Sequence, residues 1–121
     1  MSQKILIVDN DEDICQLLEV VLKGKGYEVA VAMNGIEAID KMKDFNPGLM
    51  ILDIIMPEMD GFEVCRRIRE SDNMIKILIL SARSNNEDRK KGLIIGADGY
   101  MEKPFVVNDL IAKIELLLER T

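Results

Sequence analysis

The chain contains no histidine. This absence excludes the kinds of site that need an imidazole: a catalytic triad with histidine as the base, a histidine acid–base pair, and a metal centre with histidine ligands. A metal bound by this chain would therefore be a hard cation held by oxygen atoms.

Cysteine, positive charge and long apolar runs are also scarce. Cys15 and Cys65 lie in helix-like segments without a surrounding motif, so we predict buried, reduced thiols and a cytoplasmic protein. A net charge of −6 argues against a nucleic-acid-binding surface. No apolar stretch is long enough to span a membrane, and residues 1–4 lead directly into a strand-like run without a signal peptide.

The 121 residues, 48% of them hydrophobic and 31% charged, fit one globular domain spanning residues 1–121. Five short apolar runs alternate with amphipathic segments, and we predict strands at 5–8, 27–32, 49–52, 77–80 and 99–101. Apolar side chains at helical spacing mark five helices: Ile14, Leu17, Leu18, Val21 and Leu22; Ile36, Ile39 and Met42; Phe62, Cys65 and Ile68; Leu93 and Ile94; Leu110, Ile111, Ile114, Leu117 and Leu118. This alternation predicts an α/β fold in which helices cover both faces of a parallel sheet.

Polar side chains follow four of the predicted strands. Asp9 begins an acidic run after the first strand, Asp53 follows the third, Ser81 the fourth and Lys103 the fifth. Ligands of open α/β sheets bind outside the carboxyl ends of the strands, so these residues are expected to converge. Two neighbouring carboxylates repel each other unless a cation binds, and Mg²⁺ suits such a site. Lys103 and Ser81 could then contact a phosphoryl group, and Asp53 could attack it.

With these residues in place, the chain resembles the receiver domain of bacterial two-component response regulators. The resemblance covers essentially the whole chain and rests on the joint occurrence of Ile5 to Asp9 with its acidic run, Leu52-Asp53, Met56-Pro57-Glu58-Met59-Asp60-Gly61, Leu80-Ser81-Ala82-Arg83, and Gly96-Ala97-Asp98-Gly99-Tyr100-Met101-Glu102-Lys103-Pro104-Phe105. It implies a flavodoxin-like (βα)5 three-layer sandwich with strand order 2-1-3-4-5. Chemotaxis receivers are the standard example of that order, so the order follows from the resemblance alone.

The resemblance also assigns roles to individual residues. Asp53 matches the phospho-acceptor, Asp9 an acid of the Mg²⁺ site, and Ile55 the position whose backbone carbonyl coordinates the metal. Ser81 matches the hydroxyl that turns toward the phosphoryl group, and Lys103 the lysine that contacts it. Tyr100 matches a switch aromatic that moves between exposed and buried positions. The peptide bond before Pro104 is cis in the family.

Asn10 departs from the family, which usually has a second acid there. An amide oxygen can still bind Mg²⁺, but the lost charge removes roughly 4 kcal/mol of attraction at about 4 Å and an effective dielectric of about 20. We therefore expect Asp9, Asn10, Asp53 and the Ile55 carbonyl to bind Mg²⁺ weakly, with Asp11 able to compensate if the loop rearranges.

The implied function is a phospho-acceptor switch that hydrolyses its own acyl phosphate slowly and is not otherwise an enzyme. Because the chain lacks histidine, the phosphoryl group would come from a histidine kinase or histidine phosphotransfer protein. Shifts of Ser81 and Tyr100 would change the face formed by the fourth helix, fifth strand and fifth helix, through which we expect a homodimer. Arg89, Asp109 and Lys113 suit such contacts, whereas Ile95 and Gly99 stand where acids are usual.

Three other interpretations remain open. The Asp9-Asn10-Asp11 sequence resembles the nucleophile motif of haloacid-dehalogenase-type phosphatases, which would put the phosphoryl group on Asp9; the small size and the absence of Thr or Val at position 13 count against it. A flavodoxin-like cofactor module would need a phosphate-binding loop where the acidic run would repel the FMN phosphate. A degenerate receiver would act by protein contact alone. Whether the chain stands alone or is cut from a longer regulator is also open.

Overall fold

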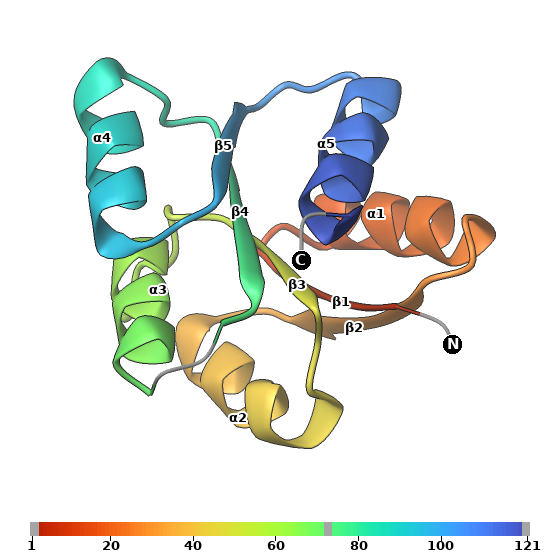
Figure 1. Ribbon diagram of the computed structural model, residues 1–121, viewed down its shortest axis with the longest axis horizontal. Coiled ribbons are helices and arrows are strands. Elements are labelled where there is room, and N and C mark those ends of the chain that lie inside the picture. The colour runs from red at the N-terminus through yellow and green to blue at the C-terminus, as the bar shows by residue number, and fades with distance from the viewer. Residues whose placement is uncertain (1–2, 72–73, 120–121) are drawn as a thin grey trace.

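A computed structural model describes residues 3–71 and 74–119. Five strands and five helices alternate along the chain, as the sequence predicts (Figure 1). They are β1 (Lys4–Val8), α1 (Glu12–Gly24), β2 (Glu28–Ala32), α2 (Gly35–Phe45), β3 (Leu49–Leu52), α3 (Gly61–Glu70), β4 (Lys76–Ser81), α4 (Asn86–Ile95), β5 (Gly99–Glu102) and α5 (Val107–Glu119).

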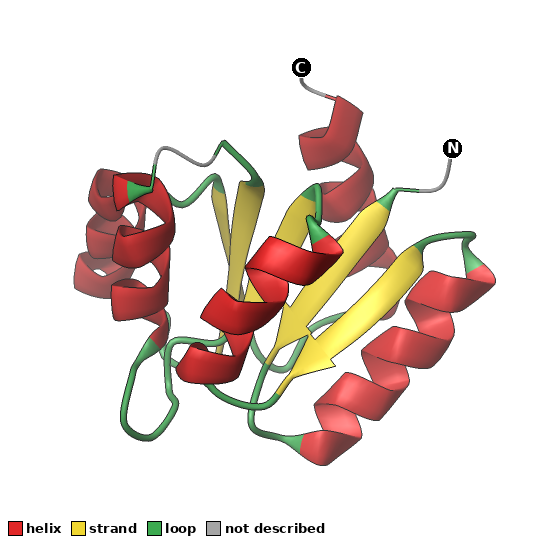
Figure 2. Ribbon diagram, turned by 90° about the horizontal axis from the view of Figure 1, so that it is seen from below, coloured by secondary structure: helices red, strands yellow, loops and turns green. Residues whose placement is uncertain are grey.

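The strands form one parallel sheet in the order β2-β1-β3-β4-β5, which confirms the expected flavodoxin-like topology (Figure 2). Pairing aligns Val8 with Leu52, and Leu52 with Ile79. The residues that follow these strands therefore emerge at one edge of the sheet.

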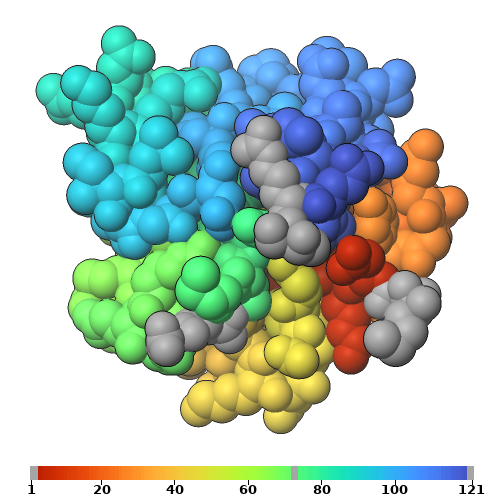
Figure 3. All heavy atoms as spheres, viewed as in Figure 1, coloured from red at the N-terminus to blue at the C-terminus, as the bar shows by residue number. Residues whose placement is uncertain are grey.

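Helices cover both faces of the sheet. α1 and α5 pack on one face, and α2, α3 and α4 lie over the other (Figure 1). Along β1, Ile5 and Ile7 enter one core cluster, whereas Leu6 and Val8 enter the other. This two-sided burial explains the continuous apolar runs in the sequence. In the space-filling view, atoms of α3 (green) and α4 (cyan) lie on one side of the molecule and those of α1 (orange) and α5 (blue) on the other (Figure 3).

Four helices begin with a short polar side chain that accepts hydrogen bonds from the first backbone N–H groups: Asp11, Asn34, Asp60 and Asn85. Such N-caps satisfy donors that have no partner within the helix. Glu12 and Asp13 lie in the first turn of α1, where acids interact favourably with the helix dipole. Asp11 is therefore engaged as the cap of α1, and its compensation for Asn10 would require the loop to rearrange.

The residues that helix α4 buries are not the ones that its apolar pattern indicates. Leu93 and Ile94 are 58% and 84% exposed, whereas Asp88 and Gly92 are buried. Gly92 packs closely against its neighbours: a Cβ there would lie 2.9 Å from Ile79 Cδ1. The helix therefore approaches the sheet at its smallest residue, and of its three large apolar side chains only that of Ile95 packs against the core. Exposed positions also include Leu17 of α1 and Ile36 of α2.

Both cysteines are free and buried, as predicted. Within the described ranges, no helix is long and apolar enough to cross a membrane.

The thiols are expected to resist modification in the folded protein. Burial raises the pKa of Cys15 to about 11, with further contributions from the Asp9 and Asp11 carboxylates, and burial also raises the pKa of Cys65. The thiolate is the reactive form, so at about pH 8 an Ellman-type disulfide reagent should label neither residue in the native protein and both in guanidinium chloride. Rapid labelling of the native protein would contradict this prediction.

Candidate functional site

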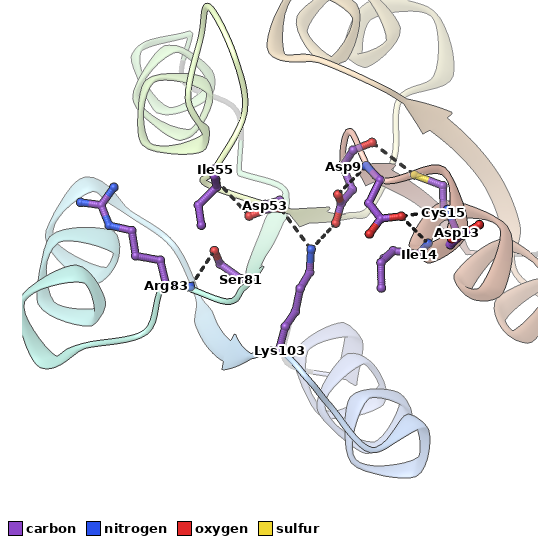
Figure 4. A network of polar contacts seen from close by, with 10 residues as sticks. Asp9, Asp13, Ile14, Cys15, Asp53, Ile55, Ser81, Arg83 and Lys103 are labelled. Atoms are coloured by element: carbon purple, nitrogen blue, oxygen red, sulfur yellow. Dashed lines mark hydrogen bonds and ion pairs between the residues drawn. The ribbon is translucent and has the colours of Figure 1, made fainter.

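Three side chains from different strand ends meet at the carboxyl edge of the sheet (Figure 4). The ammonium nitrogen of Lys103, Nζ, donates to Asp9 Oδ2 at 2.7 Å and to Asp53 Oδ2 at 3.1 Å. Lys103 therefore bridges two carboxylates that lie 94 and 50 residues from it in the sequence. The predicted convergence of Asp9, Asp53 and Lys103 is present in the fold.

The bridged carboxylates are removed from solvent. Asp9 is 3% exposed and Asp53 is 6% exposed, and the side chain of Lys103 is 16% exposed. A buried carboxylate without a partner is costly, and two adjacent ones repel each other. The shared ammonium offsets both costs while leaving the site with a net negative charge.

Burial and pairing act in opposite directions on the two kinds of group. Burial raises the pKa of Asp9, and the hydrogen bond from Lys103 offsets part of that rise. Burial alone would lower the pKa of Lys103, but hydrogen bonds to Asp9 and Asp53 outweigh it and the pKa is raised. The lysine consequently stays cationic at neutral pH and can attract an anionic group.

Backbone hydrogen bonds continue the sheet past the strand ends and fix where these side chains begin. The amide of Asp53 donates to the Val8 carbonyl at 3.0 Å, and that of Lys103 donates to the Ser81 carbonyl at 2.9 Å. The Lys103–Pro104 peptide bond is cis, as the resemblance implied.

Each carboxylate is also oriented by its own loop. Asp53 Oδ1 accepts a hydrogen bond from the Ile55 amide at 3.0 Å, and Asp9 Oδ1 accepts one from the Asp11 amide at 2.9 Å. One oxygen of each carboxylate is therefore held by backbone and the other by Lys103. Gly61 closes the loop after Asp53, because its amide donates to the Ile54 carbonyl at 3.1 Å.

Ser81 and Tyr100 are linked through a residue to which the sequence analysis gave no role of its own. Ser81 is fully buried, and its Oγ accepts a hydrogen bond from the Arg83 amide at 3.2 Å. The hydroxyl of the half-buried Tyr100 donates to the Arg83 carbonyl. The guanidinium carbon of Arg89 lies 5.2 Å from the centroid of the Tyr100 ring. Tyr100 thus contacts the segment after β4 and not the bridged carboxylates themselves.

The donor set fits a magnesium ion. Asp9 and Asp53 supply carboxylate oxygens, and Ile55 can supply a backbone carbonyl from the loop beside them. Mg²⁺ commonly takes one or two carboxylates and completes its shell with neutral oxygens and water. In the part of the chain that the structure describes, no three or more acids, cysteines or histidines cluster as a metal site. Asn10, at an exposed position, would add a neutral oxygen only.

Comparisons with known sequences point to one family. Residues 5–115 match the response regulator receiver domain. The chain is 41% identical to "Response regulator MprA" of Mycobacterium tuberculosis over 121 residues, covering 100% of this chain and 53% of that protein. It is 40% identical to "Alkaline phosphatase synthesis transcriptional regulatory protein PhoP" of Bacillus subtilis, covering 100% of this chain and 50% of that protein. The chain therefore spans about half the length of these relatives.

Solved structures give the same result. A two-component response regulator from Clostridium difficile has a TM-score of 0.94 and 34% sequence identity, over 98% of both chains. The chemotaxis protein CheY4 of Vibrio cholerae has a TM-score of 0.92 and 31% identity, over 97% of this chain and 99% of that one.

Proposed function

The chain belongs to the response regulator receiver domain family, and we propose that it accepts a phosphoryl group on Asp53 and acts as a cytoplasmic signalling switch. The observation that carries this proposal is the bridge from Lys103 to the buried carboxylates of Asp9 and Asp53. It supplies a nucleophile, a second acid and a fixed cation within one site.

In the proposed reaction, a carboxylate oxygen of Asp53 attacks the phosphorus of a phosphohistidine in a partner protein. The new O–P bond forms as the P–N bond breaks, and the imidazole nitrogen leaves with the electron pair and is protonated by solvent. Lys103 attracts the anionic phosphoryl oxygens, and the Ser81 hydroxyl donates a hydrogen bond to one of them. A histidine kinase or a histidine phosphotransfer protein provides the donor, because this chain has no histidine.

Asp9, Asp53 and the Ile55 carbonyl are the proposed ligands of Mg²⁺, with Asn10 as a weak additional one. The bound ion supplies positive charge that offsets the repulsion between the carboxylates and the phosphoryl group. Slow hydrolysis ends the signal: water attacks phosphorus, the Asp53 carboxylate leaves, and inorganic phosphate is released.

The face formed by α4, β5 and α5 is the proposed homodimer surface. Leu93 and Ile94 of α4 are exposed and give this helix apolar surface. Of the charged residues expected at this face, Asp109 is exposed, but Arg89 is already bound to the Ser84 and Tyr100 carbonyls. Sedimentation equilibrium with and without phosphorylation tests this surface, and a monomer at all concentrations under both conditions would exclude the dimer.

Phosphorylation by acetyl phosphate tests the main proposal. The protein should gain the mass of one phosphoryl group when Mg²⁺ is present and none when EDTA removes it. The adduct should be labile to hydroxylamine, as acyl phosphates are, and peptide mapping after borohydride reduction should place it on Asp53. A modification on Asp9 would instead support the phosphatase interpretation.

Restoring an acid at position 10 should strengthen metal binding. Asn10→Asp is expected to lower the Mg²⁺ dissociation constant about tenfold, because added Coulomb attraction exceeds the added desolvation cost. Titration calorimetry measures this constant. Gln16→Glu is the control, since it adds the same charge at an exposed position of α1. Equal affinities for Asn10→Asp and the parent chain would show that position 10 is not a ligand.

A further inference from the structure

Among the described residues, four buried side chains are polar or charged: Asp9, Asp53, Ser81 and Asp88. The proposed function uses the first three and leaves Asp88 without a role. Asp88 is 4% exposed, although it lies in the first turn of α4 at the surface of the fold. A buried carboxylate outside the phosphoryl site calls for an explanation, because burial of a charge is costly unless it is paired.

The helix start does not account for the burial of Asp88. Glu87 lies in the same turn, is exposed, and can interact with the helix dipole equally well. The N-cap is Asn85, whose Oδ1 accepts from the Asp88 amide at 2.8 Å. What distinguishes the Asp88 side chain is its partner: Oδ2 accepts a hydrogen bond from Arg83 Nε at 3.0 Å.

Arg83 is the residue whose backbone joins Ser81 to Tyr100. Its amide donates to Ser81 Oγ at 3.2 Å, and its carbonyl accepts from the Tyr100 hydroxyl. A serine oxygen that accepts from a backbone amide uses a lone pair and keeps its own proton free to donate. Arg83 therefore orients Ser81 as a donor, provided that the segment after β4 stays in place.

We propose that Asp88 is a positioning residue for phosphoryl transfer. Its ion pair holds Arg83 in place, and the Arg83 amide then orients the Ser81 hydroxyl toward the phosphoryl group on Asp53. The Arg83 carbonyl at the same time holds the hydroxyl of Tyr100. A shift of Ser81 on phosphorylation would then be transmitted to α4, because hydrogen bonds link Ser81 to Arg83 and Arg83 to Asp88. This inference rests on the proposed function of Asp53.

Arg89, the next residue of α4, also binds the segment after β4. Arg89 Nε donates to the Ser84 carbonyl at 3.1 Å while its guanidinium lies over the Tyr100 ring, 5.2 Å from the centroid. The segment is thus tied to the first turn of α4 at two neighbouring residues, 83 and 84. Loss of Asp88 alone should loosen it without releasing it.

The rate of phosphorylation by acetyl phosphate at saturating Mg²⁺ tests the proposal. Asp88→Ala should slow it about fivefold, comparable with the net contribution of one hydrogen bond, and Asp88→Asn should slow it less because its amide oxygen can still accept from Arg83. Glu87→Ala is the matched control and should leave the rate unchanged. Equal rates for Asp88→Ala and Glu87→Ala would overturn the proposal.

A double-mutant cycle separates positioning from general destabilisation. If Asp88 acts through Ser81, adding Asp88→Ala to Ser81→Ala should slow phosphorylation no further. An additional fivefold loss in the double variant would mean that Asp88 acts elsewhere. Thermal unfolding of each variant confirms that the folded protein is being compared, and Asp88→Asn replaces Asp88→Ala in the cycle if the latter does not fold.

A second readout does not depend on phosphorylation. The chain has two tyrosines and no tryptophan, so fluorotyrosine labelling gives two ¹⁹F resonances that Tyr27→Phe assigns. Asp88→Ala should shift the Tyr100 resonance and leave that of Tyr27 in place, whereas Glu87→Ala should shift neither. An unmoved Tyr100 resonance would refute the positioning role. Failure of wild-type Asp53 to accept a phosphoryl group would refute the proposed function instead.

Discussion

Asparagine in place of Asp53 is expected to abolish the acyl phosphate. An amide is a poor nucleophile toward phosphorus, so Asp53→Asn should gain no phosphoryl mass under conditions that label the wild type fully. The fold should persist for two reasons. In the wild type the Ile55 amide donates to Asp53 Oδ1 at 3.0 Å, and the side-chain oxygen of asparagine can accept the same hydrogen bond. Asp9 also keeps its ion pair with Lys103. Intact-protein mass spectrometry and circular dichroism measure the two effects.

Two further substitutions are the comparisons for Asp53→Asn. Asp40→Asn changes an exposed acid of α2 in the same way and should label like the wild type. Asp9→Asn removes the other bridged carboxylate and should slow labelling without preventing it, because Asp53 remains. Full labelling of Asp53→Asn would disprove the assignment, and complete loss in Asp9→Asn alone would favour Asp9 as the nucleophile.

A single methyl group at position 61 is expected to damage both fold and site. A Cβ on Gly61 would lie 2.4 Å from the Asp53 carbonyl oxygen and 2.7 Å from Ile54 Cα. These neighbours are backbone atoms of the segment that carries Asp53, the proposed phospho-acceptor, so no side-chain rotation can relieve the contact. Gly61→Ala should therefore lower the free energy of unfolding by about 2 kcal/mol or more and also slow phosphorylation. Urea unfolding and acetyl phosphate labelling measure these changes.

Gly24→Ala is the matched control for Gly61→Ala. A Cβ at Gly24, the last residue of α1, has no atom within 4 Å. Because alanine favours helix over glycine, this variant should be as stable as the parent or up to about 1 kcal/mol more stable. If Gly61→Ala unfolded at the same urea concentration as Gly24→Ala, close packing of α3 on the Asp53 segment would not be a stability determinant.

The central part of the site could be predicted because it follows from strand order and burial. Apolar runs identified the strands, and parallel strands bring the residues after them, Asp9, Asp53 and Lys103, to one edge. The strand order and the cis bond before Pro104 came from the family resemblance, since neither hydrophobic periodicity nor composition encodes them.

The remainder depends on packing that no local pattern reveals. Leu93 and Ile94 carry the apolar signal of α4, yet the helix rests on Gly92, because close approach to Ile79 and Tyr100 favours the residue without a side chain. In the sequence, Asp88 is an ordinary acid near the start of a helix, and only the structure shows its hydrogen bond from Arg83. Gly61 is the first residue of α3. The distances show that it also admits α3 against the backbone of Asp53 and Ile54.

The backbone hydrogen bonds that extend the sheet to Asp9 and Asp53 tie the two carboxylates to the inner strands of the sheet. Local opening events in proteins range from fraying of loops to global unfolding, and central strands open last. Asp9 and Asp53, which follow the inner strands β1 and β3, therefore lose their mutual geometry mainly when the sheet itself opens, whereas Lys103 follows the edge strand β5. The segment after Ser81 is held by side-chain contacts instead, so it can rearrange at much lower free-energy cost. The carboxylate site can thus keep its geometry while the neighbouring segment after Ser81 changes conformation.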